Sequence, residues 1–311
     1  MKALQDLLRD DTAGDPISGL HWTHRSLRKI CKALRCGHRI SLSAPTVARL
    51  LRQLRFSLRT CRKKKAGLKD PQRNRQFHYL IRQRRLFLAQ KWPVISVDTK
   101  KKELIADFKN PGRCWRCRER AVLDHDYPKW ASGKVIPLGI YDLAHNDGYV
   151  AVGISCETPT FEVRTIRRWW FQVGRKRYPN APRLLIQADS GGANDYRKWE
   201  WKLALQDLAD EIGIPITVTH YPPGASKWNP IEHRMFSLLS ANWAGEPLIS
   251  YETVLKHIRT TRSPMGFHCR AVLDYRPYVP LRRPTNEQRQ FVRIKRHRVL
   301  PNWNYTIVPH D

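Results

Sequence analysis

Apolar residues recur at helical spacing through the first sixty positions of the chain. Residues 22–37 place four of them on one face and end at a glycine: Leu27, Ile30, Cys31 and Leu34, then Gly37. Residues 41–57 follow, with Ser43 as a candidate N-cap, Pro45 in the first turn and a second apolar face: Val47, Leu50, Leu51 and Leu54. The spacing predicts two helices joined by a short turn, which is the form of a helix-turn-helix unit or of a plain helical subdomain.

The pattern changes after residue 91, where short β-rich segments alternate with helical ones. Five segments predict strands: 92–102, 134–143, 148–156, 183–192 and 214–222. Helical spacing returns at 160–174, at 195–213 and after Pro230. This order predicts an α/β fold in which a mixed sheet is flanked by helices.

Between these two parts lies a basic segment of helical character, residues 61–91. We therefore predict a helix-turn-helix-like region at 1–60, a basic helical linker at 61–91 and an α/β domain at 92–311.

Charge changes the picture most. The 311 residues include 57 Lys and Arg against 27 Asp and Glu, a net charge of +30, and residues 1–91 alone hold 23 basic and 5 acidic residues. Such an excess points to a polyanion such as nucleic acid, with a basic but otherwise ordinary surface as the alternative. The candidate DNA contacts in the N-terminal part are Arg49, Arg52 and Arg55 on the second helix and Lys63, Lys64 and Lys65 in the linker.

The sequence lacks the marks of membrane and secreted proteins. It has no run of about 18 apolar residues, and its first residues, MKALQDLLRDD, lack the form of a secretory signal. The seven cysteines are an odd number at scattered positions, which favours reduced thiols in a cytosol. Cys114 and Cys117 have the spacing of zinc ligands, but one such pair is weak evidence for a structural zinc.

Three carboxylates stand at the ends of predicted elements. Asp98 closes the first strand, Asp189 closes the fourth, and Glu232 opens the helix after the fifth. An acid at the end of an apolar strand has to be solvated, paired or bound to a metal. If the first and fourth strands are neighbours, the two aspartates face each other, and the helix can bring in Glu232. Singly, each acid has an ordinary alternative as a turn cap, a brace for the glycine loop or a helix N-terminal charge.

Converging carboxylates repel one another unless cations lie between them. Oxygen ligands suit Mg²⁺ or Mn²⁺, and two such ions about 3.5–4 Å apart support in-line phosphoryl transfer. The sequence therefore predicts a site for two divalent ions at Asp98, Asp189 and Glu232. Lys100 and Lys101 follow Asp98 closely and either contact a scissile DNA strand or balance local charge.

Five longer segments carry motifs that go beyond these single residues: VISVDTKKKELIADFKNPGR, GIYDLAHNDGYVAVG, QADSGGANDYR, HYPPGASKWNPIEHRMFS and the terminal WNYTIVP. Together they closely resemble the Rhodopirellula-type DDE transposase family of bacterial insertion sequences, from about residue 12 to Pro309. The resemblance implies a ribonuclease-H-like catalytic domain, a DDE triad at Asp98, Asp189 and Glu232, and metal-dependent cutting and joining of DNA.

The resemblance also implies partners and a place in the cell. The expected partners are transposon terminal inverted repeats and target DNA, bound by a homo-oligomer at the nucleoid in a bacterial cytoplasm. The Pro-Pro-Gly turn and SKWNP would hold the next helix so that Glu232 points at the metal ions. Lys227 is expected to meet a phosphate, and Trp228 either stacks on a base or anchors the loop from below. His220 and His233 are expected to be packing or hydrogen-bonding neighbours.

The chain departs from the family pattern at QADSGGAND and KDPQRNRQF, and family members carry more residues before the point where it begins. Two alternatives to an active transposase stay open. One is a catalytically silent or truncated protein that only binds transposon ends, and metal-dependent nicking would distinguish it. The other is a host nuclease of the same fold, which would hydrolyse DNA without joining strands.

Overall fold

The structure, a computed structural model, describes residues 2–9, 13–14, 21–22, 26–54, 56, 71–123, 125, 127–280 and 283–310. The chain separates into two units, residues 1–65 and 66–311. No helix in these described ranges is long and apolar enough to cross a membrane.

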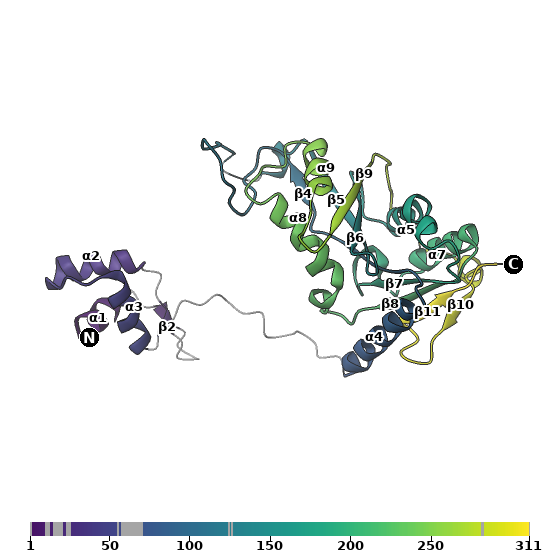
Figure 1. Cartoon of the computed structure of the whole chain (residues 1–311), viewed down its shortest axis with the longest axis horizontal. Helices are drawn as coiled ribbons and strands as arrows, with labels where there is room; N and C mark the ends of the chain where they lie inside the picture. The colour runs from purple at the N-terminus through teal and green to yellow at the C-terminus, as the bar shows by residue number, and fades with distance from the viewer. Residues whose placement is uncertain are drawn as a thin grey trace. The chain divides into compact units, whose positions relative to one another are not determined.

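The N-terminal unit is built on three helices (Figure 1): α1 (Lys2–Arg9), α2 (Leu27–His38) and α3 (Ala44–Gln53), with a short pair of strands, β1 (Ala13–Gly14) and β2 (His21–Trp22). The two predicted helices are confirmed, and the Ser43 side chain caps α3 by accepting from the Thr46 N–H at 3.3 Å. The sequence pattern missed α1, which completes the small core formed by Leu4, Leu8, Ile30, Leu34 and Val47.

The second unit is organised around one mixed sheet. In chain order its strands are β3 (Val94–Thr99), β4 (Glu103–Ile105), β5 (Gly133–Asp142), β6 (Asp147–Gly153), β7 (Leu184–Ala188), β8 (Ile216–His220), β9 (His268–Asp274), β10 (Ile294–Arg296) and β11 (Asn304–Ile307). They lie in the order β10-β11-β8-β7-β3-β5-β6-β9, and β4 pairs with β5.

All five predicted strands are present, as β3, β5, β6, β7 and β8. The first and fourth of these, β3 and β7, are parallel neighbours, whereas β5 runs antiparallel to β3. The third–second–first–fourth–fifth order of these strands, with helices on both faces, is the expected ribonuclease-H-like arrangement. The sequence pattern missed β4, β9, β10 and β11, which extend the sheet.

Helices cover both faces of the sheet (Figure 1). One face carries α5 (Pro159–Trp169), continued by a π-helical turn η2 (Trp170–Gly174) and α6 (Arg175–Arg177), together with α7 (Trp199–Ile212). The other carries a π-helical turn η5 (Glu232–Phe236), α8 (Ser237–Asn242) and α9 (Tyr251–Thr260). Shorter helices are η1 (Pro128–Trp130), η3 (Gly192–Asn194), η4 (Ser226–Trp228) and α10 (Asn286–Gln290).

The sequence of β5 explains these two layers. Its even positions, Ile136, Leu138 and Ile140, join the core under α5 and α7, whereas Val135 and Tyr141 join the core under α8 and α9. Because successive strand residues point to opposite faces, a continuous apolar run is buried on both sides.

The structure differs from the expected linker in part of residues 61–91. Helix α4 (Arg73–Ala89) packs on the sheet through Phe87, which contacts Val94 and Leu185. Its Arg84 also donates to Gln187 on β7 at 2.7 Å. This helix is therefore part of the second unit, because its buried side chains complete the core beneath β3 and β7.

Candidate active site

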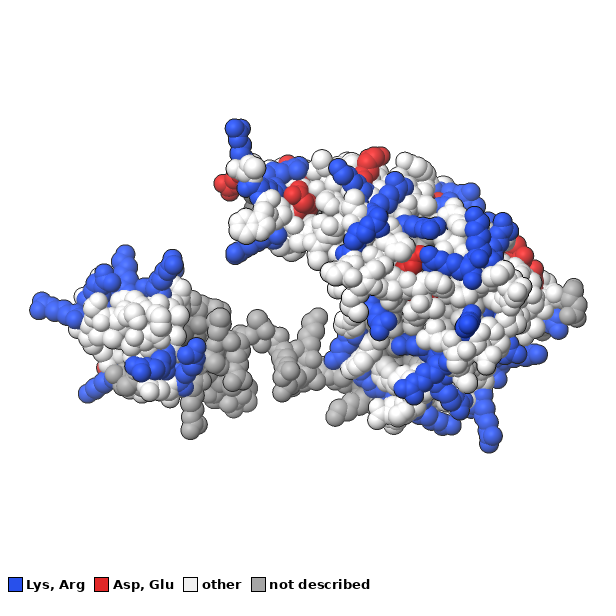
Figure 2. All heavy atoms as spheres, viewed as in Figure 1, with Lys and Arg blue, Asp and Glu red and all other residues white. Residues whose placement is uncertain are grey.

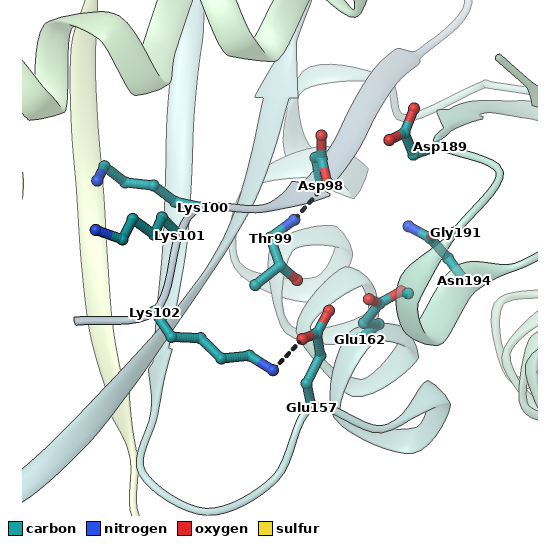
Figure 3. Close-up of a pocket in the computed structure, with 11 residues that line it drawn as sticks. Asp98, Thr99, Lys100, Lys101, Lys102, Glu157, Glu162, Asp189, Gly191 and Asn194 are labelled. Atoms are coloured by element: carbon teal, nitrogen blue, oxygen red, sulfur yellow. Dashed lines mark hydrogen bonds and ion pairs between the residues drawn. The ribbon is translucent and has the colours of Figure 1, made fainter. Parts of the chain in front are cut away.

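Two aspartates lie side by side where parallel strands end. Val97 of β3 pairs with Ala188 of β7, so Asp98 and Asp189, each the next residue, lie at the same edge of the sheet, where the β3–β7 pairing ends. Both line an open pocket of about 480 Å³ (Figure 3). The sequence-based expectation that the first and fourth strands bring these two acids together is confirmed.

Glu232 is the first residue of the π-helical turn η5, which lies on the face of the sheet covered by α8 and α9. Burial raises the pKa of Asp98 well above its usual range, and the charges of Asp189 and Glu232 raise it further. Burial, followed by Glu232, raises the pKa of Asp189 to about 6. The three predicted acids therefore lie close enough to repel one another when ionised.

Hydrogen bonds fix the Asp98 carboxylate on both oxygens. Its Oδ1 accepts from the Thr99 backbone N–H at 2.8 Å, and its Oδ2 accepts from Asn229 Nδ2 at 3.5 Å. Asn229 belongs to the SKWNP segment and is fully buried. The SKWNP loop therefore contacts the first acid of the predicted triad directly.

The two other predicted residues of this loop lie on its outer side. Lys227 is exposed, and its Nζ lies 4.1 Å from the centre of the Trp228 ring. Trp228 is 46% exposed, with the Arg73 guanidinium 4.6 Å from its ring and the Phe77 ring packed edge-on at 5.7 Å. Trp228 thus anchors the loop on α4 and also keeps part of its ring open to a ligand.

The lysines after Asp98 differ from one another. Lys100 is buried, makes an ion pair with Glu103 at 3.1 Å and lies 4.4 Å from the centre of the Trp243 ring. Burial lowers its pKa, although Glu103 opposes that shift. Lys101 is exposed at the pocket, and Lys102 forms an ion pair with Glu157 at 2.7 Å (Figure 3). Lys101 is therefore better placed than Lys100 to meet DNA.

The remaining predicted DNA contacts lie in the N-terminal part. Arg49 and Arg52 are exposed on α3, which is the position expected of a recognition helix. Arg55, Lys63, Lys64 and Lys65 lie outside the residues whose side chains are described.

Both histidines near the site hydrogen-bond to the backbone, as expected. His220 is fully buried, and its Nδ1–H donates to the Asp189 carbonyl at 2.7 Å while Nε2 accepts from the Tyr305 hydroxyl at 3.0 Å. Burial lowers the pKa of His220 to about 4. His233 is exposed and donates from Nε2 to the Lys227 carbonyl. The two exposed cysteines of the CWRC motif lie elsewhere, and Cys114 donates to Glu246 at 3.3 Å.

Two further carboxylates line the same pocket and were missed from the sequence: Glu157 and Glu162 (Figure 3). Glu162 lies in the first turn of α5 and is buried, and no described residue donates a hydrogen bond to its Oε2. Burial raises its pKa well above the usual range. The available sequence signal was an acid inside the apolar stretch TFEVRTI, where a carboxylate is expected to be exposed.

The donor set fits a divalent cation. The pocket offers carboxylate oxygens, the ligand type that Mg²⁺ and Mn²⁺ prefer, and the acids there destabilise one another without a cation between them. In the described part of the chain, no three His, Cys, Asp or Glu side chains already lie close enough together to hold a metal ion. Asp98 and Asp189 line the pocket, and Glu232 lies outside its lining.

One glycine determines how closely the Glu232 turn approaches the sheet. Gly139 of β5 pairs directly with Asp98, and a Cβ built on it would lie 2.6 Å from Phe236 and 2.9 Å from Met235. Met235 and Phe236, in the same turn as Glu232, therefore pack directly against the backbone of Gly139. Any residue with a Cβ at this position would be too close to them.

Gly139→Ala is expected to push η5 away from β5. The crowding should lower the free energy of unfolding by about 1–3 kcal/mol and, by displacing Glu232, slow DNA cleavage by about 10²-fold. Urea unfolding and a nicking assay measure the two effects. Gly37→Ala is the matched control, because a Cβ there meets nothing within 4 Å. Wild-type stability and cleavage in the Gly139 variant would show that this contact does not position Glu232.

Comparison with known proteins bears on what this pocket does. Residues 3–309 match the family described as Rhodopirellula transposase DDE domain. No curated protein matches the chain significantly.

Among solved structures, the chain is similar to two complexes of the Mos1 transposase. The paired-end complex with the left transposon end has 14% identity and a TM-score of 0.44, and the strand transfer complex has 17% and 0.45. Each comparison covers 82% of this chain and 68% of that chain.

The assignment rests on the family match, which spans nearly the whole chain and agrees with the sequence motifs around all three acids. The chain therefore belongs to the Rhodopirellula transposase DDE domain family and is a DNA transposase of the DDE type.

Proposed function

We propose that this transposase cuts and joins the ends of an insertion sequence at one site, formed by Asp98, Asp189 and Glu232. The observation that carries the proposal is the shared edge of β3 and β7, where Asp98 and Asp189 adjoin and Glu232 influences the pKa of both. A functional role explains such close carboxylates better than a structural one. Their mutual repulsion lowers the stability of the fold until a cation binds between them.

A DDE transposase depends on divalent metal ions, and we propose two Mg²⁺ or Mn²⁺ ions here. Asp98 and Asp189 would hold them from the sheet edge, and Glu232 would complete the site by turning its side chain into the pocket. When bound, such ions lower the pKa of an attacking oxygen and stabilise a leaving oxygen.

The proposed reaction has two displacements at phosphorus. In the first, water attacks a phosphodiester at the element end and the 3′-oxygen leaves, which frees a 3′-OH. In the second, that 3′-oxygen bonds to a phosphorus of target DNA and the target's own 3′-oxygen leaves. The same three acids serve both steps, because both require an in-line geometry at one phosphate.

The basic surface supplies the means of holding DNA. Lys and Arg side chains are widespread on the visible faces of both units, and acidic ones are few (Figure 2). Lys101 at the pocket and Lys227 on the loop before Glu232 would contact phosphate, and the neighbouring Trp228 would stack on an unpaired base. Arg49 and Arg52 on α3 would contact phosphates of the terminal inverted repeats, and Arg55 and Lys63–Lys65 would add further phosphate contacts.

The proposed partners are transposon terminal inverted repeats and target DNA, bound by a homo-oligomer that assembles on them. The proposed location is the nucleoid in a bacterial cytoplasm, since the DNA substrate lies there.

The test uses the purified chain, labelled DNA that carries the flanking element ends, and Mg²⁺ or Mn²⁺. We expect metal-dependent 3′-end cleavage followed by joining to a second DNA, and loss of both in Glu232→Gln. Cleavage without joining would identify a nuclease of the same fold. Tight binding without cleavage in either protein would identify a protein that only occupies transposon ends.

A further inference from the structure

We propose that Asn229 is the positioning residue that sets Asp98 and Glu232 relative to each other. The inference rests on the proposed function, in which these two acids share the metal ions. Asn229 itself has no place in the predicted triad and touches neither DNA nor metal in the proposal. It acts through the two acids, one by its side chain and the other by its backbone.

The side chain of Asn229 joins β3 at two points. Its Nδ2 donates to Asp98 Oδ2 at 3.5 Å, and its Oδ1 accepts from the Ser96 hydroxyl. Ser96 and Asp98 are alternate residues of one strand, so both point to the same face of the sheet. The side-chain amide of Asn229 therefore bridges Ser96 and Asp98 on one face of β3.

The chemistry of the partners determines the orientation of this amide. An ionised carboxylate only accepts hydrogen bonds, so the NH₂ group has to face Asp98. The amide oxygen then faces Ser96, whose hydroxyl can donate to it. A flipped amide would place its oxygen against the ionised Asp98 carboxylate and lose that bond.

The backbone of Asn229 reaches the third acid. Its carbonyl accepts from the Glu232 N–H at 3.1 Å, which begins the turn that carries Glu232. Asn229 has no exposed surface, so its position is fixed by packing as well as by hydrogen bonds. One buried residue therefore determines how far Glu232 stands from Asp98.

The start of the same loop is tied to the second acid. The Tyr221 N–H donates to the Ala188 carbonyl at 2.8 Å, and the Ser190 hydroxyl donates to the Tyr221 carbonyl. Ala188 and Ser190 flank Asp189 in the chain. The segment 221–229 thus begins beside Asp189 and ends between Asp98 and Glu232, which explains why its turn residues favour one conformation.

If Asn229 had only a structural role, its loss would lower the stability of the fold and leave metal binding unchanged. The test therefore measures stability and metal binding separately. In the double variant Ser96→Ala/Asn229→Leu, leucine has the branched shape of asparagine and no hydroxyl is left without a partner. Removing both polar partners together is close to neutral for stability. The variant should therefore fold while the orientation of Asp98 is lost.

The first readout is the rise in melting temperature that Mn²⁺ produces over EDTA, which reports metal binding without catalysis. We expect this rise to shrink in the double variant. The Mn²⁺ concentration for half-maximal cleavage should increase about 10–100-fold, the usual effect of losing a residue that orients a metal ligand. The affinity for DNA should stay that of the wild type.

Asn110→Leu provides the matched control. Asn110 also bridges a loop through its amide, donating to the carbonyls of Trp243 at 2.9 Å and Glu246 at 3.1 Å, and it neither lines the pocket nor contacts an acid of the triad. It should lower the melting temperature and keep the Mn²⁺ response. A double variant that matches the wild type in Mn²⁺ response and in half-maximal Mn²⁺ concentration would overturn the inference.

Asp98→Asn separates this failure from failure of the proposed site. If Asp98→Asn abolishes the Mn²⁺ response and the double variant keeps it, the site stands and the role of Asn229 is wrong. If Asp98→Asn also keeps the wild-type response and cleavage, the proposed site and the inference both fall.

Discussion

Asp189→Asn is expected to reduce cleavage of transposon ends by about 10³-fold or more, while DNA binding stays unchanged. Divalent ions contribute several kcal/mol to phosphoryl transfer, and each 1.36 kcal/mol is a factor of about ten in rate. Asn keeps the shape of the side chain but lacks the charge that would hold a metal ion. Binding rests on Lys and Arg contacts to phosphate, so a gel-shift titration should give the wild-type affinity.

The same variant should be more stable than the wild type in EDTA at pH 8. Burial and Glu232 raise the pKa of Asp189 to about 6, from an ordinary value of 3.8. The folded state therefore binds the proton more tightly than the unfolded state, and this contribution is lost as the pH rises through about 6. Replacing the ionised acid by a neutral amide should add about 1–3 kcal/mol to the free energy of unfolding.

Urea unfolding in EDTA between pH 4 and pH 8 measures this difference, which should shrink as the pH falls towards the unfolded-state value. Glu119→Gln provides the control, because Glu119 is an exposed acid outside the pocket. Full-rate cleavage by Asp189→Asn would remove Asp189 from the site.

The second large effect concerns salt. If the chain makes 6–10 phosphate contacts, its affinity for DNA should fall by about 10³–10⁵ between 50 and 200 mM salt, because bound counterions are released. The net charge of +30 makes a contact number of this size reasonable. Fluorescence anisotropy with a labelled terminal repeat measures the slope of log affinity against log salt.

The double variant Arg49→Ala/Arg52→Ala should reduce that slope by about 2, since each lost phosphate contact removes about 0.9. Arg167→Ala is the control, because Arg167 forms an ion pair with Glu211 and its charge is already balanced. An unchanged slope in the double variant would show that α3 does not lie on the phosphate backbone. A loss of affinity for the terminal repeat only, with the slope retained, would instead indicate contacts to base edges.

Local patterns predicted much of the catalytic unit. Strands buried on both faces have continuous hydrophobic sequences, so the pattern predicted β3, β5, β6, β7 and β8. The pattern missed the short strands β10 and β11, because they are only 3 and 4 residues long, and β11 joins the sheet by pairing with β8, which lies far earlier in the chain. Helix α4 has the sequence character of a basic linker although it belongs to the second unit, because its many Arg residues mask the few side chains that it buries.

The site shows the same division. An acid at the end of an apolar strand is visible in the sequence because its desolvation cost demands an explanation, and Asp98 and Asp189 were found in this way. The burial of Lys100 was not visible, because it depends on Trp243, which lies far along the chain. Glu162 has only a weak local signal, an acid inside the stretch TFEVRTI, because an acid in the first turn of a helix is usually solvated.

By itself, the sequence determined the type of chemistry: the acids, their order, the basic surface and the family motifs. Only the tertiary structure decided how these acids are held, through contacts such as Ser96 with Asn229 and Gly139 with Phe236. The physical reason is one of range. Propensity and periodicity act over a few residues and leave a trace in the sequence, whereas a hydrogen bond across 133 positions forms only after the sheet has brought its partners together.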